Sequence, residues 1–270
     1  MLKKLLLLAG VMTLMGQSLA SAAGTTESVP LTFAYANQTG QHLNVSQTTD
    51  DKPAAYTEAY CQPGHVLTIS YEKTQKMGAD STGRNTAQNF LQDEGAIFGV
   101  NKGRADDNQS CVVAKKGAFQ GYTFYTFAPS PAKGQLTDKV VKKITKHYQR
   151  KVVRQGLIAK IGKETSIALV EFQPKGKHAL ASIVLVSPSG ILYHDLPGEI
   201  DKDHYSTWRV DDGGEILPEH FRFMFAAHSK QGYALGLEWF GAEGSSLYVL
   251  KQQKDQLVPV AHGARYTSPL

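Results

Sequence analysis

A succession of short apolar segments joined by turns constrains this chain most. The segments after residue 155 read GLIAKIG, TSIALVEFQ, HALASIVLVS and GILYHDL, with KGK and SPSG as connections. The pattern continues in FRFMFAAHS, YALGLEWFG and SSLYVLKQQ, joined by KQG and AEG. Connections this short cannot hold a parallel crossover, so they predict an antiparallel β meander.

The residues before this meander also favour strands. PLTFAYANQTGQHLNVSQ alternates around Thr39-Gly40, as in a hairpin, and HVLTISYE and GYTFYTFA read the same way. The fold class is therefore mainly β, with α+β as the alternative, and a sandwich or a barrel-like sheet fits. Propeller blades would also fit, but no fixed-period repeat supports them.

One segment, LTDKVVKKITKHYQRKVVRQG, predicts an amphipathic helix at about 138–154. Thr137 is its expected N-cap and Gly156 its C-terminal stop. At 3.6 residues per turn, one face collects the apolar residues, which are Val140, Val141, Ile144, Tyr148 and Val152. A second, short helix is expected at 85–94.

The division of the chain follows from its ends and from one linker. Residues 1–22 are predicted to be a secretory signal peptide, cleaved after Ala22 or after Ala20. They combine a basic start, MLKK, an apolar run, LLLLAGVMTLMG, and a cleavage region with small residues, QSLASAA. APSPAKGQ, at 128–135, is the linker candidate. We expect a β-rich N-terminal domain at 23–130 and a helix plus antiparallel sheet at 131–270. The expected location is periplasmic or secreted, with no transmembrane segment after signal cleavage.

The two cysteines are the only pair available for a disulfide. In an oxidising compartment, Cys61 and Cys111 are expected to bond to each other. The bridge would close a loop of about 50 residues, worth roughly 4 kcal/mol in the chain-entropy model.

Charge is unevenly distributed. The chain carries 29 Lys+Arg and 24 Asp+Glu, a net charge of +5, which argues against nucleic acid as a partner. The positive excess lies in the predicted helix, where Lys142, Lys146 and Arg150 are candidates for binding an anionic surface. A solvated helix face, or attraction to an acidic segment, would explain these cations equally.

The acidic segment is ILYHDLPGEIDKDHYSTWRVDDGGE, residues 191–215. It fails the regular calcium-loop spacing, but an irregular divalent-cation site from Asp201, Asp203, Asp211 and Asp212 is a candidate. His194 and His204 are alternative zinc ligands. Plain acidic turns need no ligand at all. Trp208, beside the acids, is a candidate for stacking on a sugar. We expect this segment to lie mainly at the surface and to join two strands of the C-terminal sheet.

Signatures of common enzymes are missing from the sequence. The chain has no HExxH, no GxSxG and no CxxC, and GLIAKIGKE departs from a phosphate-binding loop. The sequence therefore favours an exported, non-enzymatic β-rich binding or interaction protein without a bound cofactor. Its expected partner is an anionic envelope surface, a glycan or a secreted protein. The alternative is an envelope hydrolase, with or without a metal, that uses the acids and histidines of 194–220. A third alternative is an inhibitor-type partner of another secreted enzyme.

Overall fold

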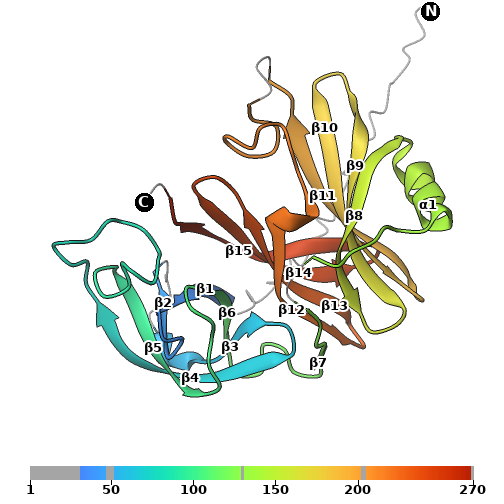
Figure 1. The fold of residues 1–270 in the computed structure, drawn as a ribbon. Helices are drawn as coiled ribbons and strands as arrows, with labels where there is room; N and C mark the ends of the chain where they lie inside the picture. The colour runs from blue at the N-terminus through green and yellow to red at the C-terminus, as the bar shows by residue number, and fades with distance from the viewer. Residues whose placement is uncertain (1–30, 47–51, 129–130, 202–204, 269–270) are drawn as a thin grey trace, which may run out of the picture.

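The computed structural model describes residues 31–46, 52–128, 131–201 and 205–268. It is a mainly β protein built of two sheets, one closed into a barrel and the other curled (Figure 1). The predicted signal peptide and Asp203 and His204 of the acidic segment lie outside the described residues.

The barrel comes from the N-terminal part of the chain. Its six strands close in the order β1-β2-β5-β4-β3-β6, and all pairs are antiparallel. They are β1 (Leu31–Ala36), β2 (His42–Val45), β3 (Tyr56–Gln62), β4 (His65–Gln75), β5 (Gly95–Lys102) and β6 (Ser110–Lys115). The 3₁₀ turn η1 (Pro53–Ala55) leads into β3.

The predicted disulfide is confirmed inside this barrel. Cys61 on β3 and Cys111 on β6 stand on neighbouring strands, with their sulfur atoms 2.03 Å apart. Both side chains are buried among Ala59, Leu67 and Val113. The bridge therefore links two barrel strands that are 50 residues apart in sequence.

The second sheet has nine strands in the order β7-β12-β13-β14-β15-β11-β10-β9-β8. Its members are β7 (Thr123–Phe124), β8 (Val152–Ile161), β9 (Thr165–Lys175), β10 (His178–Ser187), β11 (Gly190–Glu199), β12 (Phe221–Ser229), β13 (Gly232–Phe240), β14 (Gly244–Gln253) and β15 (Gln256–Tyr266). The predicted antiparallel pairing is confirmed in both meanders, β8 to β11 and β12 to β15. A single parallel pair, Tyr193 with Gln256, joins the two meanders.

The predicted helix is present but shorter than expected. Helix α1 (Asp138–Tyr148) ends at Gln149, which takes the left-handed conformation, and the chain enters β8 at Val152. The expectation that the helix reaches 154 and stops at Gly156 was wrong, because the β-branched pair Val152-Val153 begins a strand instead. Gly156 lies within β8, where a Cβ would come within 2.8 Å of Pro218.

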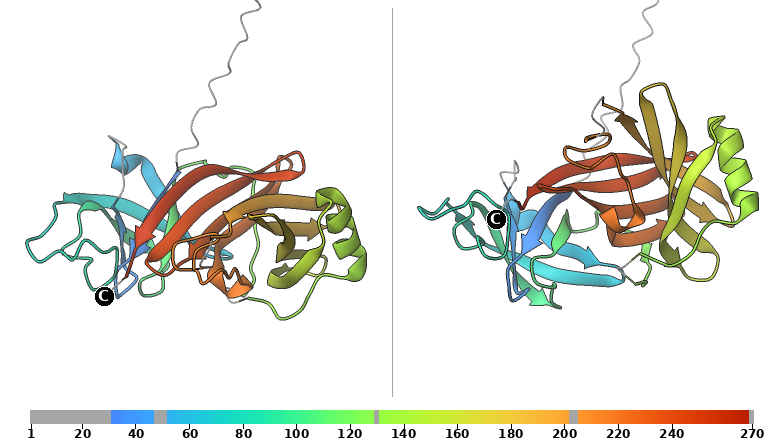
Figure 2. Two further views of the ribbon diagram at one scale, coloured as in Figure 1. Left: turned by 90° about the horizontal axis from the view of Figure 1, so that it is seen from above. Right: turned by 45° about the horizontal axis from the view of Figure 1, so that its top comes forward.

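Helix α1 packs against the outer face of the curled sheet (Figure 2). Its buried Ile144 contacts a cluster that includes Phe172 and Tyr193, with Val140 and Tyr148 beside it. The expected short helix at 85–94 is wrong. That segment forms consecutive turns, because Asn89 bonds through its side chain to Arg84 O and to the N–H of Thr82.

A buried polar network connects the barrel to the curled sheet. Glu238 on β13 accepts hydrogen bonds from Ser110 of the barrel, at 2.6 Å, and from Arg222 of β12. Arg265 on β15 donates to the carbonyl groups of Asn85 and Asn108. The two sheets therefore share polar as well as apolar contacts. β7, which precedes the predicted linker, pairs with β12 of the curled sheet.

Candidate functional site

The acidic segment divides into a strand and a connection. Residues 190–199 form β11, with Leu192, His194 and Leu196 buried, while most other described residues of the segment are exposed or partly exposed, as expected of a segment that lies mainly at the surface. Pro197 and Gly198 continue the strand opposite Leu180 and Ala179. Only the stretch after Glu199 connects β11 to the 3₁₀ turn η2 (Pro218–His220) and β12.

Asp212 organises this connection. Its carboxylate accepts four backbone N–H groups, those of Thr207, Trp208, Arg209 and Gly214, at 2.6 to 2.9 Å. Burial alone would raise the pKa of the carboxyl, but the four donors together lower it below its ordinary value. Because the donors surround both oxygens, Asp212 acts as the centre of a turn and is poorly placed to bind a cation.

Arg209 ties the connection to the curled sheet. Its guanidinium donates to the carbonyl of Trp239 at 3.0 Å and to the hydroxyl of Ser246 at 2.8 Å. It also donates to the Gly244 carbonyl and lies over the Trp239 ring, 5.3 Å from the centroid. A Cβ at position 241 would meet Arg209 Nε at 2.3 Å, so Gly241 permits this close approach. Burial lowers the pKa of the guanidinium.

Trp208 faces the protein rather than a ligand. Its indole N–H donates to the Leu196 carbonyl at 3.2 Å, and its ring packs against the core of the curled sheet. Its position therefore suits an anchor for the connection better than the predicted sugar-stacking surface.

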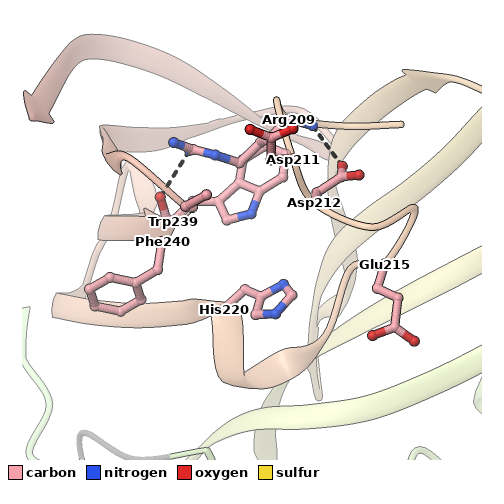
Figure 3. A pocket seen from close by; sticks show the side chains of 9 residues that line it. Arg209, Asp211, Asp212, Glu215, His220, Trp239 and Phe240 are labelled. Carbon is pink, nitrogen blue, oxygen red and sulfur yellow. Dashed lines mark hydrogen bonds between the residues drawn. The ribbon is translucent and has the colours of Figure 1, made fainter. Parts of the chain in front are cut away.

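A hollow of about 260 Å³ opens between this connection, the 3₁₀ turn η2 and the end of β13. Figure 3 shows Phe240 and His220 on one side of it and Arg209, Asp211 and Asp212 on the other. The lining residues are Arg209, Asp211, Asp212, Glu215, His220, Trp239, Phe240, Gly241 and Ala242. Acceptors, donors and aromatic rings thus meet in one small space.

His220 presents a defined nitrogen to the hollow. The backbone N–H of Leu217 donates to its Nδ1 at 3.3 Å, so the neutral ring carries its proton on Nε2. No described residue hydrogen-bonds to Nε2. The Nε2–H of His220 is therefore an oriented hydrogen-bond donor at the edge of the hollow.

The four predicted cation ligands do not form a set in the described residues. Asp201 and Asp211 are exposed, Asp212 is bonded to the backbone, and Asp203 lies outside the described residues. Within the described ranges, no three His, Cys, Asp or Glu side chains stand close enough to hold a metal ion. A cation site here stays a prediction.

His194, a predicted zinc ligand, makes a hydrogen bond that holds two strands together. It is buried on β11, and its Nδ1 donates to the Leu257 carbonyl of β15 at 3.0 Å. Burial lowers the pKa of its imidazole. His194 therefore links the two meanders at the point where they meet.

The predicted cations gather at one end of the curled sheet. Lys142 and Lys146 are exposed on α1, and Arg150 donates to the His178 carbonyl from the turn after the helix. Residues 131–178 hold twelve Lys or Arg and three Asp or Glu, a net charge of +9 against +5 for the whole chain. We call this segment, which contains α1, β8 and β9, the basic end.

Most cations of the basic end form no ion pair within the part of the chain that the structure describes. Only Arg154, with Glu171 and Glu215, and Lys177, with Glu199, form ion pairs to described carboxylates. The exposed lysines without such a pair are Lys133, Lys139, Lys142, Lys143, Lys146, Lys151, Lys160, Lys163 and Lys175. This concentration is wider than the helix from which it was predicted.

Sequence reasoning missed two residues of the hollow, Arg209 and Phe240, and it reached His220 only as one of the histidines of 194–220 in the hydrolase alternative. The turn signal DDGG after Arg209 indicated a tight loop, but no local pattern indicates that it folds back on β13.

No protein-family model, curated protein or solved structure matches this chain at a significant level. Within the described residues, no helix is long and apolar enough to cross a membrane.

Proposed function

We propose that this is an exported, non-enzymatic interaction protein that docks on an anionic phospholipid surface through its basic end. The observation that carries the proposal is the net charge of +9 on residues 131–178, where most of the cations form no ion pair with a carboxylate among the described residues. Like charges held together at one end repel one another, and a negative surface relieves that repulsion. The disulfide and the β-rich fold fit an oxidising compartment outside the cytoplasm.

A bilayer suits the basic end better than a soluble polyanion. Val153 is 51% exposed and stands between Lys151 and Arg154. An apolar side chain among cations can enter the interface between headgroups and acyl chains while the cations remain at the phosphates. Each Lys or Arg near such a surface contributes about 1 kcal/mol.

The test is co-sedimentation with vesicles of phosphatidylglycerol and phosphatidylcholine, using vesicles of phosphatidylcholine alone as the uncharged reference. The triple variant Lys142→Gln, Lys146→Gln, Arg150→Gln removes three charges. Its affinity should fall about 100-fold, since about 3 kcal/mol corresponds to two powers of ten.

The matched control removes the same charge from the barrel. Lys73, Lys76 and Lys102 are exposed on β4, just after it and on β5. Replacing all three by Gln should leave vesicle binding within a few-fold of wild type. Equal losses in both triple variants would show that net charge, rather than the basic end, is responsible. Binding to heparin without binding to vesicles would make a polyanionic glycan the partner and overturn the proposal.

A further inference from the structure

The hollow beside His220 keeps polar groups that the fold does not use. Asp212 and Arg209 direct their bonds to the protein itself. The carboxylate of Asp211 has no partner among the described residues, and that of Glu215 reaches only Arg154, at 3.9 Å. The Nε2–H of His220 also has no hydrogen-bond partner among the described residues.

The geometry points to a binding site for a saccharide ring in this hollow, separate from the basic end. A hydroxyl group both donates and accepts, so a sugar can donate to Asp211 and Glu215 and accept from His220. Phe240, 37% exposed, supplies an apolar wall for the C–H face of a sugar ring. A volume of about 260 Å³ suits one ring rather than a large ligand.

Charged ligands fit the hollow less well. An anion would face three carboxylates, and the only guanidinium is already bonded to carbonyl groups of β13 and β14. A cation would face the Nε2–H of His220, and it would gain little from Asp211 and Glu215 because both are exposed to screening by water and salt. A neutral ligand with hydroxyl groups meets neither obstacle.

The frame around the hollow is fixed before any ligand arrives. The four bonds to Asp212 set the turn, and the bonds of Arg209 hold that turn against β13. His220 is oriented by the Leu217 N–H. Groups that are already ordered lose little conformational entropy on binding, which favours recognition by a few polar contacts.

Tryptophan fluorescence is a direct probe, because the chain has only two tryptophans and both are close to this site. Trp239 lines the hollow, and Trp208 belongs to the connection beside it. The protein is titrated with glucose, galactose, mannose and N-acetylglucosamine in separate experiments. At least one should give a saturable change, and the change should survive in Trp208→Phe.

Three variants locate the binding. His220→Ala and Phe240→Leu should each weaken the sugar that binds by tenfold or more. His228→Ala, near the end of β12 that is farther from η2 and outside the hollow, should bind as wild type does. Circular dichroism melts confirm that each variant is folded. Phe240→Leu keeps the apolar bulk, so it remains informative if His220→Ala fails to fold.

The inference is overturned if no sugar gives a saturable change up to about 100 mM, a concentration that would detect a Kd on the order of 10 mM. It is also overturned if His220→Ala and His228→Ala lose the same affinity. Saturable binding of lysine or glycine with no response to any sugar would replace the saccharide by a charged ligand.

Discussion

Replacing Glu238 by Gln should destabilise the protein strongly, because it removes the only acidic member of a buried cluster with two guanidinium groups. The carboxylate is 1% exposed. It accepts from Ser110 of the barrel and from Arg222, whose side chain is 26% exposed, and it lies near the buried Arg265. The Gln side chain keeps the volume but leaves both arginine charges without their counter-charge.

The expected cost follows from the burial of the remaining partners. Breaking a buried ion pair by removing one partner costs about 3–5 kcal/mol, and the partial exposure of Arg222 places this case near 3 kcal/mol. In a chain of this length, that corresponds to a fall in melting temperature of roughly 6–12 °C. The pKa of Arg265, which burial lowers to about 10, indicates how poorly this region solvates an unpaired positive charge.

The assay is urea unfolding followed by circular dichroism, with Glu164→Gln as the control. Glu164 is exposed in the turn between β8 and β9, so its replacement should change the free energy of unfolding by less than about 0.5 kcal/mol. Adding Arg222→Met to Glu238→Gln should recover part of the loss, since the two residues are coupled. A Glu238→Gln protein as stable as the control would refute the role given to this cluster.

Three further outcomes are expected. Asp212→Asn should lose about 2 kcal/mol at pH 7 through its weaker bonds to the backbone N–H groups. Folding lowers the pKa of Asp212, so the stabilisation by its ionised carboxylate is present above the ordinary pKa near 3.8. It is lost as pH falls through the lowered pKa. The melting temperatures of wild type and Asp212→Asn should therefore converge in acid. Burial lowers the pKa of His194, so the unfolded chain binds its proton more readily below pH 6.5. The melting temperature should therefore fall from pH 7 to pH 5, and in His194→Gln this fall should be smaller. An unchanged fall in the variant would show that other groups cause the pH dependence. Finally, thiol labelling of the denatured, unreduced protein should find no free cysteine, and Cys61→Ala with Cys111→Ala should lose about 2–4 kcal/mol in urea unfolding. Two labelled thiols would contradict the bridge.

Most of the fold follows from local sequence patterns. The turns KGK, SPSG, KQG and AEG predicted the two antiparallel meanders, because short connections leave no other pairing. Barrel closure could not be predicted, since β1 pairs with β6 across most of the N-terminal sequence. The parallel contact of β11 with β15 is equally long-range and depends on a single residue pair.

The misjudged C-terminal end of α1 has a local physical cause. Helical periodicity continues past Tyr148 in sequence, and only the left-handed Gln149 and the β-branched residues after it end the helix. Val152, expected on the helix, packs against the same cluster from its place in β8. Val152 is therefore apolar and partly buried in the strand that replaces the expected last turns of the helix.

The candidate sites were predictable to different degrees. Part of the basic end could be predicted from the concentration of Lys and Arg in the sequence, because lysines are almost always exposed. The hollow was not, since its parts come from the connection after β11, from η2 and from the end of β13. From sequence alone, Asp212 could either stabilise a turn or bind a cation. Its four hydrogen bonds from backbone N–H groups favour the turn.

The most direct measurement of the central claim is the orientation of the protein on an anionic vesicle. Val153→Cys at the basic end and Val66→Cys on the barrel are exposed sites that each carry one environment-sensitive dye, without removing a charge. On phosphatidylglycerol vesicles, the dye at position 153 should shift to the blue and be quenched by spin-labelled lipid, and the dye at position 66 should do neither. High salt should abolish the response at 153. Equal responses at both positions, or a response at 66 alone, would contradict docking through the basic end.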